Sequence, residues 1–99
     1  MIKLTDRTAN STSFHGTTIK VTVNELNKII GEAQIIGNDG QDKVNFDWTC
    51  ENSNGDVFTI YDWKEYRALD LDETIVFHIG GESKSITEQS KNELLDLLY

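Results

Sequence analysis

Apolar and polar residues alternate along two segments that flank an Asn-Gly turn, and this pattern predicts a β-hairpin at the centre of the chain. From Val44 to Glu51 an apolar side chain occupies every second position, which is typical of a strand with one buried face. The turn falls at Asn52–Gly55, where Asn-Gly is a strong hairpin signal. The returning segment Val57–Trp63 is apolar or aromatic on both faces. It therefore predicts a central strand, or a strand that presents one face to a partner.

A short helix is expected before the hairpin. Thr22 and Glu25 have the T-x-x-E spacing of a capping box, in which each side chain satisfies a free backbone amide near the other. The apolar residues that follow fall on one helical face, so we predict a helix over 23–30. Gly31 is expected to end it. The residues before this helix include 1–13, which predict a loose arm or a short first strand.

A strand and a second helix are expected after the hairpin. The alternation over 74–79 predicts a strand, and the two glycines that follow are expected to break it. Ser85, with Glu88 three residues on, predicts the start of a helix over 86–98. The residues expected to pack this helix against the core are Ile86, Leu94, Leu97 and Leu98.

These elements together predict an α+β fold. A further strand is expected over 33–36, followed by a turn over 37–40 that is rich in Gly, Asn and Asp. The prediction is a small antiparallel β-meander of three to five strands, with a short N-terminal helix and a C-terminal helix packed on one face. With 99 residues, the chain is expected to form a single domain over 1–99.

The net charge is −8, and it is unevenly distributed. Residues 39–73 hold ten carboxylates and three basic residues, so this part alone carries −7. Such a balance argues against direct nucleic-acid binding and against binding to an anionic membrane, since both need clustered Lys and Arg. Two interpretations stay open. The charge can serve solubility alone, or it can imitate the charge of nucleic acid and compete for a basic groove.

The sequence contains no recognisable catalytic or metal-binding pattern. His15 and His78 lie far apart and share no ligand spacing with Cys50. No nucleophile elbow and no catalytic cysteine signature is present. We therefore expect no catalytic residues, no metal and no cofactor, and a protein that is not an enzyme. A single cysteine excludes an intrachain disulfide, and no signal peptide or membrane span is recognised, so a cytoplasmic location is expected.

The hairpin and the residues just after it form the first candidate site. Residues 44–66 hold six of the nine aromatic residues, and Trp, Tyr and Arg are enriched at the energetic centres of protein interfaces. One alternative stays open, in which these aromatic residues are core anchors. The residues expected to bind a partner are Asp47, Asp62, Trp63, Lys64, Tyr66 and Arg67.

The Gly-Gly turn before the last helix forms the second candidate site. Glycines let the backbone approach a ligand closely, and the N-terminus of a helix favours an anion. The alternative is a plain connection between a strand and a helix, and Glu82 within the turn would repel an anion. The residues expected to bind a small anionic ligand are Gly80, Gly81, Ser83, Lys84 and Ser85, with Tyr61 stacking on a base.

Four strings in the chain add a resemblance to these observations: FHGTTI, VNFDW, DVFTIYDWKEYR and FHIGG. In them the chain resembles small proteins of tailed bacteriophages whose function is unassigned. The resemblance implies a non-enzymatic binding protein that acts in the host cytoplasm by inhibiting a host protein, with antiviral defence as the expected target. The alternative is a sponge that binds a signal nucleotide across a homodimer. A cellular adaptor domain stays open as a third interpretation.

Overall fold

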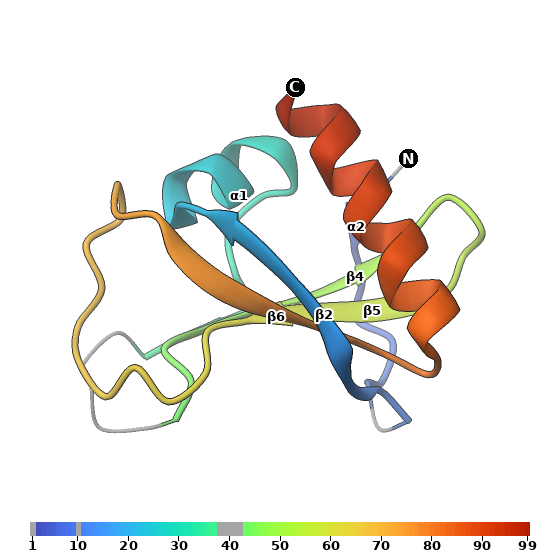
Figure 1. Cartoon of the computed structure of the whole chain (residues 1–99), viewed down its shortest axis with the longest axis horizontal. Helices are drawn as coiled ribbons and strands as arrows, with labels where there is room; N and C mark the ends of the chain where they lie inside the picture. The colour runs from blue at the N-terminus through green and yellow to red at the C-terminus, as the bar shows by residue number, and fades with distance from the viewer. Residues whose placement is uncertain (1, 10, 38–42) are drawn as a thin grey trace.

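The described residues of the chain form an antiparallel sheet of six strands with two helices on one side of it (Figure 1). This computed structural model describes residues 2–9, 11–37 and 43–99, so most of the turn predicted over 37–40 lies outside the described residues. The α+β prediction is confirmed. In chain order the elements are β1 (Lys3–Leu4), β2 (Ser13–Val21), α1 (Val23–Ile29), β3 (Ile35–Ile36), β4 (Phe46–Glu51), β5 (Val57–Tyr61), β6 (Ile75–Gly81) and α2 (Lys84–Leu98).

The strands lie in the order β1-β4-β5-β6-β2, and β3 also pairs with β4. The meander β4-β5-β6 is the one that the sequence predicts, and its hairpin turn contains Gly55 at a positive φ of 80°. The sheet has one strand more than the predicted three to five, because β2 is not among the predicted strands. The two very short strands β1 and β3 share one edge. Leu4 of β1 lies opposite Cys50 at one end of β4, and Ile36 of β3 lies opposite Phe46 at the other.

The longest strand, β2, is not among the elements that the sequence predicts. Its pairing with β6 shifts register between Phe14 and Thr18, so the alternation that marks a strand is interrupted. Gly16 lies inside this irregular stretch with a φ of 90°. Beyond it the pattern is regular, and Ile19 and Val21 are buried. This bulge is the physical reason for the missed strand.

The first helix is confirmed almost as predicted. The Thr22 side chain accepts from the Glu25 amide, and the Glu25 side chain accepts from the Thr22 amide, so both halves of the capping box are present. Gly31 follows the helix with a φ of 121°, a backbone conformation that favours glycine. Its carbonyl oxygen accepts a hydrogen bond of 2.9 Å from the indole N–H of Trp48. This bond fixes the end of the helix to the buried face of β4.

The end of the chain differs from its prediction in three respects. The two glycines do not break β6 but form its last residues, where Gly80 pairs with Thr59. Ser83, not Ser85, caps α2, and its hydroxyl accepts from the Ile86 amide. The helix therefore begins earlier than predicted. Leu97 is exposed and was wrongly placed in the packing stripe, whereas Leu94 is fully buried.

The core lies between the helices and the inward residues of the meander. Trp48, Cys50, Phe58 and Phe77 are fully buried there, as the alternation of their strands predicts. The rings of Trp48 and Phe77 meet edge to face, with centroids 5.7 Å apart. Burial raises the pKa of the Cys50 thiol to about 12, so this cysteine stays protonated at neutral pH and behaves as a small apolar residue.

Candidate binding site on the open face of the sheet

The side of the sheet away from α1 and α2, here called the open face, is not covered by either helix of the described chain (Figure 1). Strand register aligns four residues across it. Ile35 lies opposite Asp47, Asp47 opposite Tyr61, and Tyr61 opposite His78. Residues directly opposite on neighbouring strands share a face. Side chains from four different strands therefore form one row.

A depression lies beside this row because the next positions carry little side chain. Gly80 lies opposite Thr59, and a Cβ atom at Gly80 would lie only 2.6 Å from the Thr59 hydroxyl oxygen. The absence of that side chain leaves a depression of about 270 Å³. Among the residues that line it are Ser13, Asp47, Thr59, Tyr61, Trp63 and Gly80.

Four rings on the open face contact one another and are here called the aromatic cluster: Phe14, Tyr61, Trp63 and His78. Tyr61 and Trp63 also line the depression. Phe14 stacks on His78 with centroids 4.0 Å apart, and Trp63 lies 6.2 Å from the same imidazole. Tyr61 meets Trp63 edge to face at 6.0 Å. Phe14 is 44% exposed and Trp63 40% exposed. Burial lowers the pKa of His78, so the imidazole is neutral at pH 7 and packs as a ring.

Asp47 forms the polar wall of the depression. Its Oδ1 atom is buried and has no hydrogen-bond partner within the described part of the chain. Burial, together with the nearby carboxylate of Asp62, raises the pKa of Asp47 to about 6. Burial, and after it the Asp47 carboxylate, raises the pKa of Tyr61. A buried polar atom without a partner is uncommon in folded proteins, so Asp47 is the most unusual group of this face.

Asp62 is not the exposed contact residue that the sequence reasoning expected, since its side chain is fully buried. Its carboxylate accepts hydrogen bonds from the backbone amides of Asn45 and Phe46 and from the Asn45 side chain. The strand pattern places Asp62 on the inward side of β5, and these amides compensate the buried charge. The residue holds the loop together and is not accessible to a partner.

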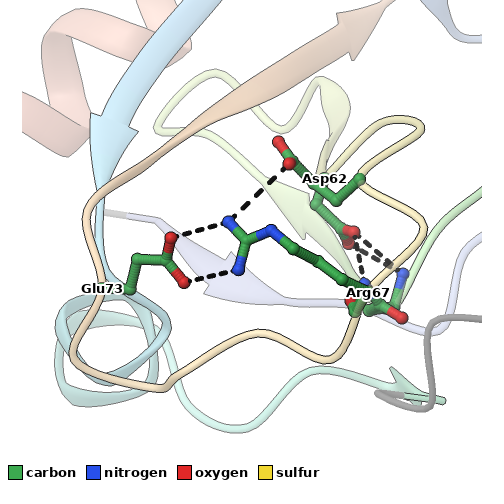
Figure 2. A network of polar contacts seen from close by, with 5 residues as sticks. Asp62, Arg67 and Glu73 are labelled. Atoms are coloured by element: carbon green, nitrogen blue, oxygen red, sulfur yellow. Dashed lines mark hydrogen bonds and ion pairs between the residues drawn. The ribbon is translucent and has the colours of Figure 1, made fainter.

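The remaining residues of the expected partner surface lie in the loop after β5. The Arg67 guanidinium donates to both carboxylate oxygens of Glu73, at 2.8 and 2.6 Å, and Glu65 lies 3.8 Å away (Figure 2). The charge of the Arg67 guanidinium is therefore already compensated by carboxylates of this chain. Tyr66 is exposed. The Lys64 ammonium lies 5.5 Å from the centroid of the Trp63 ring.

Lys43 also approaches the Trp63 ring, with its ammonium 5.8 Å from the centroid. The two lysines are held together by their backbones, because the Lys64 amide donates to the Lys43 carbonyl at 2.7 Å. Lys64 itself has a positive φ of 56°. Trp63 is thus already a place where ammonium groups of this chain lie.

The residues expected to bind an anionic ligand are not brought together. Gly80 and Tyr61 line the depression, but a Cβ at Gly81 would meet Thr87 and Ile86 of α2, on the buried side. Ser83 is occupied as the helix cap. The Lys84 ammonium lies 3.5 Å from the His15 carbonyl oxygen, and Ser85 is exposed on α2. The turn is therefore built mainly as a strand-to-helix connection.

The sequence reasoning missed two parts of the site: Phe14 and the Gly80–Thr59 pair. His78 lies on the open face, but its stacking partner Phe14 belongs to β2, which the sequence pattern does not predict. The signal that could have found the depression is a glycine inside a strand, which often marks close approach of a neighbouring group.

Comparisons of the chain with protein families, with curated proteins and with solved structures give no match. Within the described residues, no group of three or more His, Cys, Asp or Glu side chains is arranged to hold a metal ion. The same residues contain no helix that is long and apolar enough to cross a membrane.

Proposed function

We propose that the protein is a non-enzymatic binding protein that holds a partner protein on the open face of its sheet. The observation that carries the proposal is the exposed aromatic cluster beside a depression with an unpartnered carboxylate oxygen. Rings that pack against one another and still expose part of their surface are suited to anchor an interface. A sheet face with apolar exposure is also a common place for a partner to pack.

The size of the depression favours a protein partner over an enclosed small molecule. Pockets for drug-sized ligands usually measure roughly 300–1,000 Å³, and this depression measures about 270 Å³. It can receive one side chain or one ring. Such a subsite is useful when the rest of the contact area comes from the surrounding surface, as in a protein interface.

The resemblance to small tailed-phage proteins leads us to propose a host protein as the partner, with inhibition of antiviral defence as the role and the host cytoplasm as the location. The mechanism is occlusion of the partner's working surface. The net charge of −8 would accelerate the encounter with a basic partner, and the rate of association would fall as salt increases.

The nucleotide sponge is kept as the second candidate, moved from the Gly80–Ser85 turn to the depression. The observation that favours it is the pair of lysines beside Trp63. A base could stack on Trp63 while the lysines bind its phosphate. A thermal-shift series with mononucleotides and cyclic dinucleotides tests it, since a ligand at a hundredfold excess over its Kd stabilises by about 2.7 kcal/mol.

Partner capture from host lysate tests the leading proposal, with a double variant that removes the anchors, Phe14→Ala with Trp63→Ala. The matched control is Val76→Ala, because Val76 lies on the same face and is also 40% exposed but is not part of the aromatic cluster. We expect the double variant to lose at least about 30-fold in affinity, as for an interface anchor, and the control to bind normally. Equal capture by all three proteins would contradict the proposal.

A further inference from the structure

We propose that the depression beside Asp47 receives one arginine side chain of the partner protein, with its guanidinium paired to the Asp47 carboxylate and lying against the Tyr61 and Trp63 rings. This inference rests on the proposed function and names the chemistry that the open face recognises. It specifies the basic partner by one residue type, arginine, that binds in one place, the depression.

The unpartnered oxygen of Asp47 is the first reason. Oδ1 is buried and lacks a donor among the described residues, although Asp62 nearby receives three different amide groups. The two carboxylates therefore differ in their hydrogen bonds. The Asp62 carboxylate has its donors within the fold, whereas Oδ1 of Asp47 lacks one. Oδ1 is closed to solvent in this structure, so the pairing requires a rotation of the Asp47 carboxylate towards the depression that this residue lines. An arginine then presents two parallel N–H groups that match a carboxylate and supplies the donor that Asp47 lacks.

The aromatic walls are the second reason. A guanidinium is planar, weakly hydrated and stacks on aromatic faces. Trp63 already has the ammonium groups of Lys64 and Lys43 at 5.5 and 5.8 Å from its ring centroid, which indicates that cations are stabilised there. Both lysines are exposed and have flexible stems, so they can move into solvent when an arginine enters. They are internal competitors of the incoming cation.

Charge and position favour an arginine over a nucleotide. The chain carries a net charge of −8, which attracts a cationic side chain and repels a phosphate. Asp47 also lies between two groups with apolar surface on the neighbouring strands, Ile35 of β3 and the Tyr61 ring of β5. A charged pair ringed by apolar contacts excludes water, and this is the usual setting of an arginine that dominates an interface.

A peptide titration followed by NMR tests the subsite without the partner. The probes are the blocked tripeptide Gly-Arg-Gly and its citrulline counterpart, which has nearly the same shape and no charge. The signals are the Trp63 indole N–H and the side-chain carboxyl carbon of Asp47. We expect the arginine peptide to shift both and to bind at least tenfold more tightly than the citrulline peptide. Equal binding of the two peptides, or no binding of either, would overturn the inference.

Two variants assign the binding to Asp47. In Asp47→Asn the side chain keeps its shape and loses its charge, and we expect at least a tenfold loss of affinity for the arginine peptide. Asp96→Asn is the matched control, because it makes the same change on an exposed residue of α2. We expect no change there. A similar loss in both variants would mean that only the overall charge matters, and would overturn the specific pairing.

The lysine variant separates arginine from nucleotide. We expect Lys43→Gln with Lys64→Asn to bind the arginine peptide at least twofold more tightly, because the competing ammonium groups are gone. Asparagine is chosen at Lys64 because it tolerates the positive φ of 56°. If instead guanosine or adenosine monophosphate shifts the same signals and loses affinity in this variant, the subsite is a nucleotide site and the arginine inference is wrong.

Failure of this inference can be distinguished from failure of the proposed function. If capture of the partner is lost with the Phe14 and Trp63 substitutions but kept in Asp47→Asn, the open face is still the interface and the arginine pairing is overturned. If capture is unaffected by either change, the open face is not the interface, and the proposed function fails first.

Discussion

The Asp62 carboxylate accepts hydrogen bonds from both amide groups of Asn45, its backbone N–H at 2.9 Å and its side-chain Nδ2 at 3.1 Å. The same Nδ2 donates to the carbonyl oxygen of Arg67 at 2.9 Å. These bonds connect the residue before β4, the residue after β5 and the loop beyond it (Figure 2). Trp63 comes directly after Asp62, so the network holds the base of the aromatic cluster in place.

Removal of this carboxylate should destabilise the fold. Asp62→Ala removes the carboxylate acceptor of the backbone amides of Asn45 and Phe46, and each such loss costs roughly 1–3 kcal/mol. We expect the free energy of unfolding to fall by about 3 kcal/mol or more, measured by urea denaturation. Asp62→Asn keeps one acceptor oxygen and should cost less. A neutral result for Asp62→Ala would show that water replaces the carboxylate, and would remove the positioning role.

Because of Asp47, the free energy of unfolding should fall as pH rises, which is the opposite of the usual effect of a carboxylate. Its pKa is about 6 in the fold against an ordinary value of 3.8. Between these values the folded chain keeps a proton that the unfolded chain has lost, so stability falls as pH rises across the window and is constant above it. We expect a loss of about 1–2 kcal/mol after allowance for solvent screening.

The control for this prediction is Asp47→Asn, which should be the more stable protein at pH 7 and should lack the fall between about pH 4 and pH 6. His78 acts in the opposite sense, because its lowered pKa makes the unfolded chain bind the extra proton, and stability is lost as pH falls. This contribution is common to both proteins and cancels in their difference. A difference that does not change with pH would contradict the raised pKa of Asp47.

Gly80→Ala should destabilise the protein although alanine is normally favoured over glycine inside a strand. The new Cβ would lie 2.6 Å from the Thr59 hydroxyl oxygen, and such overpacking typically costs about 1–3 kcal/mol. In a Thr59→Ala background the cost should be much smaller, since the clashing atom is gone. Gly37→Ala is the open-space control, because nothing lies within 4 Å of its added Cβ. Thermal denaturation of five proteins tests this: the unchanged protein, the three single variants and the double variant.

The corrected start of α2 gives a direct test by matched serine substitutions. The Ser83 hydroxyl accepts from the Ile86 amide at 3.3 Å, so Ser83→Ala should cost about 1 kcal/mol of unfolding free energy. Ser85 is exposed in the first turn, and Ser85→Ala should change stability by less than about 0.5 kcal/mol. The reverse order of effects in urea denaturation would restore Ser85 as the cap.

The meander and α1 could be predicted from sequence because their signals are local. The alternation from Val44 to Glu51, the Asn-Gly turn and the Thr22–Glu25 capping box each depend on residues within a few positions. The strand β2 could not be predicted in the same way, because its bulge is compatible with the fold only through pairing with β6. Local periodicity does not contain information about a partner strand some sixty residues away.

The candidate site shows the same limit. Asp47 and Asp62 both look like hairpin carboxylates in sequence, and alternation places them on opposite sides of adjacent strands. Only the structure shows that Asp62 is buried on backbone and side-chain amides while Asp47 has an oxygen without a donor. The number and direction of available donors depend on tertiary packing, so charge counts along the chain could not distinguish the two.

The pairing of β2 with β6 has a consequence for how the chain folds during synthesis. β2 ends at Val21 and its partner begins at Ile75, so a ribosome must deliver most of the polypeptide before this edge of the sheet can form. Until then β2 has no neighbouring strand to pair with and its apolar face stays unpacked. The entropic cost of closing this long loop is therefore met only late in synthesis. We expect nascent chains cut before Ile75 to be protease-sensitive, and protection to appear only once β6 and α2 have left the exit tunnel.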